Sequence, residues 1–356
     1  MAFCLLQSLC AQIKLVDSLT QEPVVAVNVF SIDGVLLGVS DAEGQVNLDN
    51  LHGKSENSVT VQHVAYQNKK IPDSTLFSMD TIYLVPRNFE IGEVTIMDRS
   101  KFDYVMLKGY FRKQDLLNNA TRYFYDGIVE YYIPLKKKGR IENRLLQYRL
   151  FANSKSLDEY IQLMGKTFSD PPSLIGLSPE SIMNDLPKGT AVVTDHNKLI
   201  LQKDGVHLGF IQQSKNGNVQ VYFDKVPPQK VVNRRLFRIK GKTYRALTME
   251  NYVETDLDKP EVENLVSKIR SNVGAIQRKT EDGFIPMESF SEFYVMERSY
   301  LTVEDIKEMK DLFTKSSFLE EHSNYQEKFW LDLDRYDIPP LAEGIANQLG
   351  KELKER

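Results

Sequence analysis

Both cysteines of the 356-residue chain, Cys4 and Cys10, fall within its first ten residues. The remainder must therefore fold without a disulfide bond, and it can hold neither a thiolate metal site nor a cysteine nucleophile. A chain of this length does not need disulfides, because domains of ordinary size bury enough apolar surface to fold alone. Its content of 42% hydrophobic and 26% charged residues is typical of globular proteins, and its length favours two or three domains.

The first residues are apolar and end in Ala11-Gln12, after which a polar, alternating sequence begins. This pattern is typical of the end of a secretory signal followed by a small-residue cleavage site. We therefore expect residues 1–11 to be a partial signal peptide, which makes this an exported protein. Two alternatives remain open: a short apolar first strand, and a lipoprotein anchor attached through Cys10.

Residues 12–97 consist of short β-type runs separated by turn signals, with no segment of helical periodicity. Asp33-Gly34 and Glu43-Gly44 stand where tight turns need positive φ. Several short strands spaced about 8–12 residues apart predict a small β-sandwich.

Three segments in this stretch carry a resemblance to a known family: Asp17 to Val29, Gly38 to Leu48, and Ile82 to Pro86. In this order they resemble a carboxypeptidase-like regulatory domain, although His63-Val64-Ala65-Tyr66 lacks a glycine that the family usually has. The resemblance implies a seven-stranded, transthyretin-like sandwich of the kind found in Gram-negative, Bacteroides-type cell-envelope proteins. In that family the module serves as a docking or spacer element and carries no catalytic residues.

Residues 98–356 mix helical and β-type patterns, which predicts an α+β domain with a curved antiparallel sheet and flanking helices. Long β-type runs at 123–133 and 145–151 are expected to pair. Asn216-Gly217 and Lys240-Gly241 are expected to form hairpin turns. The expected helices are those at 101–117, 157–164, 261–269, 302–315, and from Pro339 onward.

No catalytic constellation is evident in the sequence. The five histidines never stand four residues apart, which removes the helical zinc-peptidase pattern. A Gly-x-Ser-x-Gly elbow, a phosphate-binding glycine loop and a dinucleotide fingerprint are also missing. We therefore predict no catalytic residue, no metal ligand and no cofactor.

Two basic clusters are the candidate binding residues. Arg234, Arg235, Arg238 and Lys240 alternate in a way that could line a concave sheet face and bind an anion. A second cluster at 136–140 follows Tyr131 and Tyr132, which could grip an anionic glycan or lipid headgroup. The simpler alternative for such runs is a solvated hairpin tip.

The net charge of −4 argues against a nucleic-acid partner. No apolar run reaches the roughly 18 residues that a transmembrane helix needs. We expect a non-enzymatic protein of the periplasm, or of the periplasmic face of the outer membrane. Its sandwich would contact an envelope protein and its larger domain would bind a small molecule, lipid, glycan or second protein. Two rivals stay open: a hydrolase whose site is assembled from distant carboxylates or histidines, and a lipid or lipoprotein carrier with an apolar cavity.

Overall fold

A computed structural model describes residues 12–356 except 26, 33–35, 42, 48–57, 64–65, 77, 87–100, 137–138, 166–170, 179–185, 196–197, 214–217, 228–229, 254, 279–282 and 317. The chain divides into two compact units. The first unit contains Met1–Glu90 and Pro339–Gln348, and the second contains Ile91–Ile338 and Leu349–Arg356. The predicted signal peptide at 1–11 and the predicted boundary at 97/98 lie outside the described residues.

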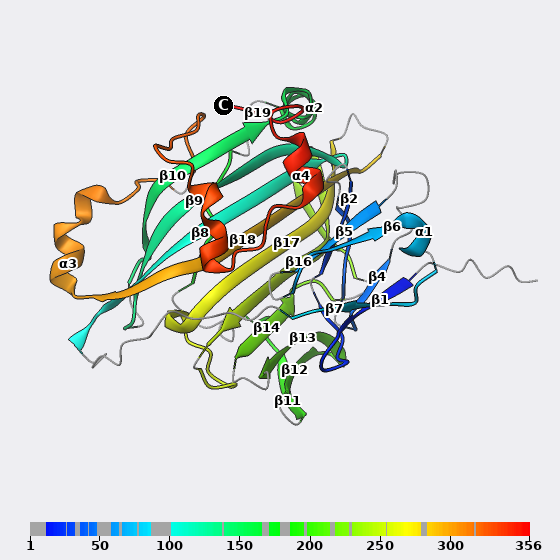
Figure 1. Cartoon of the computed structure of the whole chain (residues 1–356), viewed down its shortest axis with the longest axis horizontal. Helices are drawn as coiled ribbons and strands as arrows, with labels where there is room; N and C mark the ends of the chain where they lie inside the picture. Colours follow the sequence, from blue (N-terminus) through cyan, green and yellow to red (C-terminus); the bar gives the residue numbers. More distant parts are fainter. Residues whose placement is uncertain are drawn as a thin grey trace, which may run out of the picture. The chain divides into compact units, whose positions relative to one another are not determined.

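The first unit is built from two small sheets (Figure 1). One has the strand order β4-β1-β7 and the other has the order β3-β2-β5-β6. The only helix within residues 12–86 that the structure describes is the four-residue α1, and α4 comes from the C-terminal part of the chain. Its elements are β1 (Gln12–Asp17), β2 (Asn28–Ser31), β3 (Leu36–Val39), β4 (Gln45–Asn47), β5 (Ser58–Gln62), β6 (Lys69–Pro72), α1 (Asp73–Leu76), β7 (Thr81–Leu84) and α4 (Glu343–Gln348).

One aliphatic core joins the two sheets of the first unit. Ile13 and Leu15 alternate inward along β1 and pack in the same cluster as Val59 and Val61 of β5. This is the arrangement of a β-sandwich, in which the inner faces of two sheets share a core. The predicted turn at Glu43-Gly44 is present: Gly44 has φ +73°, and a Cβ there would lie 2.6 Å from the Leu15 carbonyl oxygen.

The second unit is dominated by one antiparallel sheet of twelve described strands. Their order is β11-β12-β13-β14-β16-β17-β18-β8-β9-β10-β19, with β15 paired to β16 beside this path. The strands are β8 (Tyr104–Leu117), β9 (Ala120–Pro134), β10 (Glu142–Ala152), β11 (Ala191–Asp195), β12 (Lys198–Lys203), β13 (Val206–Gln213), β14 (Val219–Asp224), β15 (Val232–Leu236), β16 (Ile239–Tyr252), β17 (Leu265–Arg278), β18 (Ile285–Leu301) and β19 (Lys354–Glu355).

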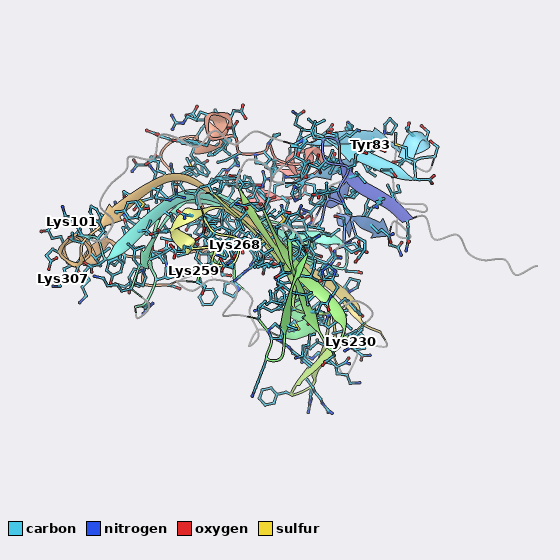
Figure 2. The ribbon with its side chains drawn as sticks, turned by 90° about the horizontal axis from the view of Figure 1, so that it is seen from below. Tyr83, Lys101, Lys230, Lys259, Lys268 and Lys307 are labelled. Atoms are coloured by element: carbon cyan, nitrogen blue, oxygen red, sulfur yellow. The ribbon has the colours of Figure 1, made fainter. Side chains whose placement is uncertain are left out.

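This sheet is strongly curved, as Figures 1 and 2 show. Register shifts interrupt the pairing at six described places, including Asp115/Leu116 between β8 and β9 and Thr243/Arg245 between β16 and β17. Bulges of this kind bend a strand and increase its twist, so they account for the curvature. No helix in the described part of the chain is both long and apolar enough to cross a membrane.

One face of the sheet, here called the core face, carries the apolar side chains Phe111, Tyr131 and Phe293 together with their neighbours on other strands. Residues 171–178 lie over it without regular structure. Their backbone is fixed by tyrosines of β9: the Tyr131 hydroxyl donates to the Ile175 carbonyl at 2.5 Å, and the Ser173 amide donates to the Tyr125 hydroxyl at 3.1 Å. The buried Ile175 then fills the core.

The opposite face of the same strands carries an ion-pair row, formed by Glu292, Arg112, Asp126 and Arg149. These residues stand directly opposite one another on β18, β8, β9 and β10, so negative and positive charges alternate across the sheet. Glu292 pairs with Arg112, and Arg149 donates two hydrogen bonds to Asp126, one of them at 2.9 Å. The indole ring of Trp330 covers the Arg149 guanidinium at 3.9 Å. All four charged residues are buried.

The predicted α+β class is wrong, because the structure is mostly β and the second unit is dominated by one large antiparallel sheet, with only two helices and short 3₁₀ turns among its described residues. The predicted helix at 101–117 is strand β8. The predicted helix at 261–269 consists of the 3₁₀ turn η5 (Val262–Asn264) and the start of β17. Most positions from Val105 to Leu117 are buried, so the run lacks the polar alternation of a half-buried strand. A strand buried on both faces cannot be distinguished from a buried helix by periodicity alone.

Several local predictions agree with the structure. α2 (Ser154–Met164) covers the predicted helix at 157–164, and β9 pairs with β10 as expected. Thr302 and Asp305 form the predicted capping box of α3 (Val303–Glu308), although the helix is much shorter than predicted and is followed by the 3₁₀ turn η6 (Lys310–Leu312). Helix α4 is likewise shorter than the helix predicted from Pro339.

The two hairpin predictions have different outcomes. Strands β13 and β14 pair around Asn216-Gly217 as predicted, although the turn residues themselves lie outside the described residues. The turn predicted at Lys240-Gly241 is wrong. Leu236 pairs with Ile239, so the turn is Phe237-Arg238, and Gly241 lies within β16 opposite Arg234. The residue with positive φ in this turn is Phe237, at 52°, and not the predicted Gly241.

Candidate functional site

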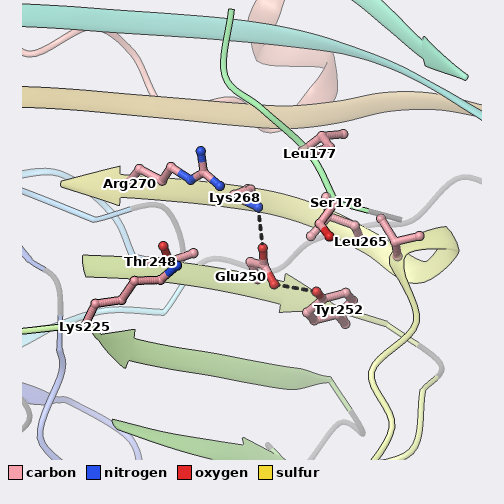
Figure 3. A pocket seen from close by; sticks show the side chains of 10 residues that line it. Leu177, Ser178, Lys225, Thr248, Glu250, Tyr252, Leu265, Lys268 and Arg270 are labelled. Carbon is pink, nitrogen blue, oxygen red and sulfur yellow. Dashed lines mark hydrogen bonds and ion pairs between the residues drawn. The ribbon is translucent and has the colours of Figure 1, made fainter. Parts of the chain in front are cut away.

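A polar pocket opens on the core face of the large sheet, between β16, β17 and the end of residues 171–178 (Figure 3). Its cavity volume is about 30 Å³, room for one or two water-sized groups. The pocket is lined by Leu177, Ser178, Lys225, Thr248, Glu250, Tyr252, Val262, Leu265, Lys268 and Arg270.

Strand register brings the polar side chains of the pocket together. Glu250 stands opposite Lys268, and Thr248 stands opposite Arg270, in the antiparallel pair β16–β17. Residues separated by two positions on a strand point to the same face, so all four project toward the pocket. Figure 3 shows these side chains rising from the two neighbouring strands, with Ser178 contributed from above.

Glu250 is the centre of a buried hydrogen-bond network. The Lys268 ammonium lies 2.7 Å from Glu250 Oε1, and the Tyr252 hydroxyl donates to Glu250 Oε2 at 2.6 Å. Glu250 is 5% exposed and Lys268 is 4% exposed, so the ion pair is shielded from water. Burial, together with the neighbouring Glu250 carboxylate, raises the pKa of Tyr252 well above its usual value. Both carboxylate oxygens of Glu250 are therefore engaged.

Arg270 differs from Lys268 because no described residue accepts a hydrogen bond from its guanidinium. The side chain is half-buried and lies beside the backbone of Gly176, where a Cβ would stand 3.7 Å from Arg270 Nη1. Lys225 adds a further cation at the pocket wall. Three cations thus line a pocket that contains one carboxylate, and that carboxylate is occupied by Lys268 and Tyr252. The pocket is suited to hold an anionic group.

The ten lining residues include a single carboxylate and no histidine, so the pocket contains neither a pair of carboxylates nor a histidine beside a carboxylate. Nowhere in the described ranges do three or more His, Cys, Asp or Glu side chains gather closely enough to hold a metal ion.

The structure places the predicted binding residues elsewhere. Arg234, Arg235, Arg238 and Lys240 lie together on the β15–β16 hairpin, where their side chains are exposed. They do not line the pocket of the core face, and their role as ligand-binding residues stays a prediction.

Tyr131 and Tyr132 lie on β9, and each is only 3% exposed. Tyr131 is bound to the Ile175 carbonyl, and the Tyr132 hydroxyl donates to Glu130 at 2.6 Å. Burial raises the pKa of both hydroxyls. The structure therefore gives the two tyrosines internal partners and does not join them to the arginines.

Sequence reasoning missed the pocket residues because it assigned 261–269 to a helix. Lys268 and Arg270 both belong to strand β17, and they lie on one face of it because they are two residues apart. Thr248, Glu250 and Tyr252 repeat this spacing on β16. Two neighbouring runs with polar residues at alternate positions were the available signal, and it could be interpreted only after the correct secondary structure was known.

No protein-family model matches the chain, and no curated protein matches its sequence. The resemblance of residues 12–97 to a carboxypeptidase-like regulatory domain therefore stays a prediction.

Proposed function

We propose that this protein is a non-enzymatic binding protein whose second unit holds the anionic end of a small ligand at Arg270. The observation that carries the proposal is the half-buried Arg270 guanidinium, to which no described residue offers an acceptor, in a pocket with an excess of positive charge. A guanidinium is always charged and presents a planar set of donors, which matches a carboxylate or a phosphate.

The neighbouring ion pair supports the same ligand class. Because Lys268 and Tyr252 already occupy Glu250, this carboxylate does not neutralise Arg270. An incoming oxyanion would meet Arg270 and the hydroxyl groups of Ser178 and Thr248. The guanidinium and the hydroxyl groups are hydrogen-bond donors in their ordinary protonation state, so they can bind an oxyanion without any change of protonation.

The size and lining of the pocket constrain the rest of the ligand. A volume of about 30 Å³ accommodates the anionic end group but not a whole organic molecule. Leu177, Val262 and Leu265 give the lining an apolar part. The ligand class that fits best is an organic acid or phosphate ester with an apolar body outside the pocket.

The first unit has a separate role in this proposal. Its resemblance to a regulatory-type sandwich supports a docking contact with a cell-envelope protein, in the periplasm or at the periplasmic face of the outer membrane. This pocket supports neither rival function: it offers one carboxylate to a hydrolase, and it is too small for the acyl chain of a carried lipid.

Isothermal titration with octanoate, monooctyl phosphate and neutral octanol tests the pocket. We expect the two anions to bind and octanol not to bind. Arg270→Gln should weaken anion binding by about tenfold or more, since a hydrogen bond to a charged group is lost. The matched control is Arg335→Gln, which removes an exposed arginine outside the pocket and should leave binding unchanged.

Two results would contradict the proposal. One is equal binding of octanol and octanoate, which would mean that the anionic group is not recognised. The other is unchanged anion affinity in Arg270→Gln. The thermal unfolding midpoint of each variant shows whether a loss of binding reflects a loss of folding.

A further inference from the structure

The segment from Lys230 to Arg245, here called the basic hairpin, contains seven Lys or Arg residues and no Asp or Glu. The whole chain has a net charge of −4, so removing this +7 segment leaves −11 on the rest. Such asymmetry produces a directed electrostatic field that orients a protein toward a charged partner.

The basic hairpin is also an edge of the sheet. Strand β15 pairs with β16 alone, so its other side has no described strand. Arg235 stands opposite Lys240, and Asn233 stands opposite Lys242, which places three cations on one face of the hairpin. Figure 2 shows Lys230 far from Lys101 and Lys307, which lie at another end of the second unit.

Few of these cations have an acidic neighbour. Arg245 lies 3.5 Å from Asp224, and Lys242 lies over the ring of Phe284 at 4.2 Å. Apart from Arg245, none of the seven is within ion-pair distance of a carboxylate in the described ranges. Their charge is therefore available to an external anion.

Phe237 occupies the turn of the hairpin in an unusual state. It is 78% exposed, the highest value for any large hydrophobic side chain in the described ranges, and it has φ +52°. A bulky residue in this left-handed region is strained, and glycine, asparagine or aspartate would fit the turn better. Turn geometry does not favour a phenylalanine here, and most of its side chain faces solvent, where it can meet an external partner.

Other apolar side chains accompany Phe237 among the cations. Val231, Val232 and Tyr244 are 40%, 37% and 42% exposed. Basic residues interleaved with exposed aromatic and aliphatic residues are the composition of segments that lie in the interface of a membrane.

We infer that the basic hairpin binds the surface of an anionic lipid membrane, with its cations at the headgroups and Phe237 inserted among them. The chemistry favours a membrane over a nucleic acid, because exposed valines gain free energy in a lipid interface and have no comparable role against phosphates or stacked bases. The negative charge of the rest of the chain is repelled by the same surface, which leaves the hairpin as the contact. This contact is independent of the pocket at Arg270.

Co-sedimentation with phosphatidylcholine vesicles that contain one quarter phosphatidylglycerol tests the inference, and pure phosphatidylcholine vesicles are the comparison. We expect binding to the anionic vesicles only, weakened at high salt because the charges are exposed. The triple variant Arg235→Gln/Arg238→Gln/Lys240→Gln should lower the partition coefficient by about 10- to 100-fold. The charge-matched control is Lys307→Gln/Lys310→Gln/Lys315→Gln, which should bind as the wild type does.

Phe237→Asn tests the apolar contribution without a folding cost, because asparagine accepts positive φ more readily. We expect weaker vesicle binding together with an unchanged or higher thermal midpoint. The inference is overturned if the triple variant and its control lose binding equally, or if pure phosphatidylcholine vesicles bind as well. Tighter binding to a single-stranded DNA oligomer than to anionic vesicles at the same salt would also overturn it. Arg270→Gln should leave vesicle binding intact, which separates this result from the test of the pocket.

Discussion

The two units of the chain are both built from β-sheets, yet they fill their interiors differently. The core cluster of the first unit consists of aliphatic residues, and among the residues of this unit that the structure describes the buried ionisable side chains are Asp17 and His63. The second unit buries many more charges in the described ranges: Arg112, Asp115, Arg122, Asp126, Arg149, Glu250, Glu263, Lys268 and Glu292.

Sheet size explains this difference. In the first unit β4, β6 and β7 are only partly buried, and β2 and β5, which are buried at every position, are only four and five residues long, so few charged side chains become buried there. The long strands β8 and β9 are buried at most positions, as are residues 148–152 of β10 and 290–294 of β18, so polar residues at alternate positions become buried as well. A buried charge is tolerated only when it is paired. The ion-pair row Glu292–Arg112–Asp126–Arg149 meets this requirement by placing opposite charges side by side on adjacent strands.

The largest effect should come from breaking that row at Asp126. Asp126→Asn leaves Arg149 without a charged acceptor and removes a neighbour of Arg112, which should cost about 3–5 kcal/mol of unfolding free energy. Trp330 is the single tryptophan of the chain and contacts Arg149, so its fluorescence during urea unfolding reports on the second unit.

The control for this variant is Glu297→Gln. It removes an ion pair between β18 and β8 of the same sheet, with Lys108 at 3.0 Å, but the Glu297 side chain is 48% exposed. Exposed pairs contribute about 0–1 kcal/mol. Equal destabilisation by both variants would show that burial of the row is not what makes it important.

The same contrast explains which parts of the molecule were predictable. The turn at Gly44, the capping box of Thr302 and Asp305, and helix α2 are determined by residues close in sequence. Local side-chain and backbone chemistry was sufficient for these elements.

The ion-pair row and the pocket were not predictable in this way. Asp126 and Glu292 become members of one row only through the register of β18, β8 and β9, which join distant parts of the chain. Strand β8 also lacked the alternation that would have revealed it, because the large sheet is covered on both faces. The pairing of the pocket residues Glu250 and Lys268 was likewise not predictable, because it requires β17 to be a strand and its register with β16 to be known.

The second-largest expected effect is a dependence of the first unit's stability on pH. Burial lowers the pKa of His63 from 6.5 to about 3, so folding favours the neutral imidazole. Below pH 6.5 the His63 imidazole is protonated in the unfolded state but stays neutral in the folded state. The first unit should therefore lose stability as the pH falls toward 3, by up to about 1.4 kcal/mol per pH unit.

Hydrogen exchange measured by mass spectrometry on peptides from β2 and β5 detects this change in the first unit. His63→Gln removes the titrating group and should flatten the dependence below pH 6.5. Trp330 fluorescence serves as the internal control for the second unit. If exchange in β2 and β5 has the same acid dependence in His63→Gln as in the wild type, His63 is not its source.

The smallest expected effect is a loss of stability of the second unit as the pH rises, which is opposite in direction to the effect of His63. Glu288 lies on β18 between Leu116 and Val273, and burial raises its pKa to about 7. The folded state then holds a proton that the unfolded state releases near pH 4.5. The stability of the second unit should fall between pH 4.5 and 7, by at most about 3 kcal/mol, and then level off.

Glu288→Gln keeps the shape of the protonated carboxyl and cannot ionise, so above pH 7 it should raise the urea midpoint followed by Trp330. Below pH 4.5 the variant and the wild type should have the same stability, because both then carry a neutral side chain at this position. An unchanged midpoint at pH 8 would mean that Glu288 reaches water in the folded state. Glu288 would then add nothing to the buried charge of the second unit, and the contrast with the first unit would rest on the buried charged residues named above, among them the ion-pair row and the Glu250–Lys268 pair.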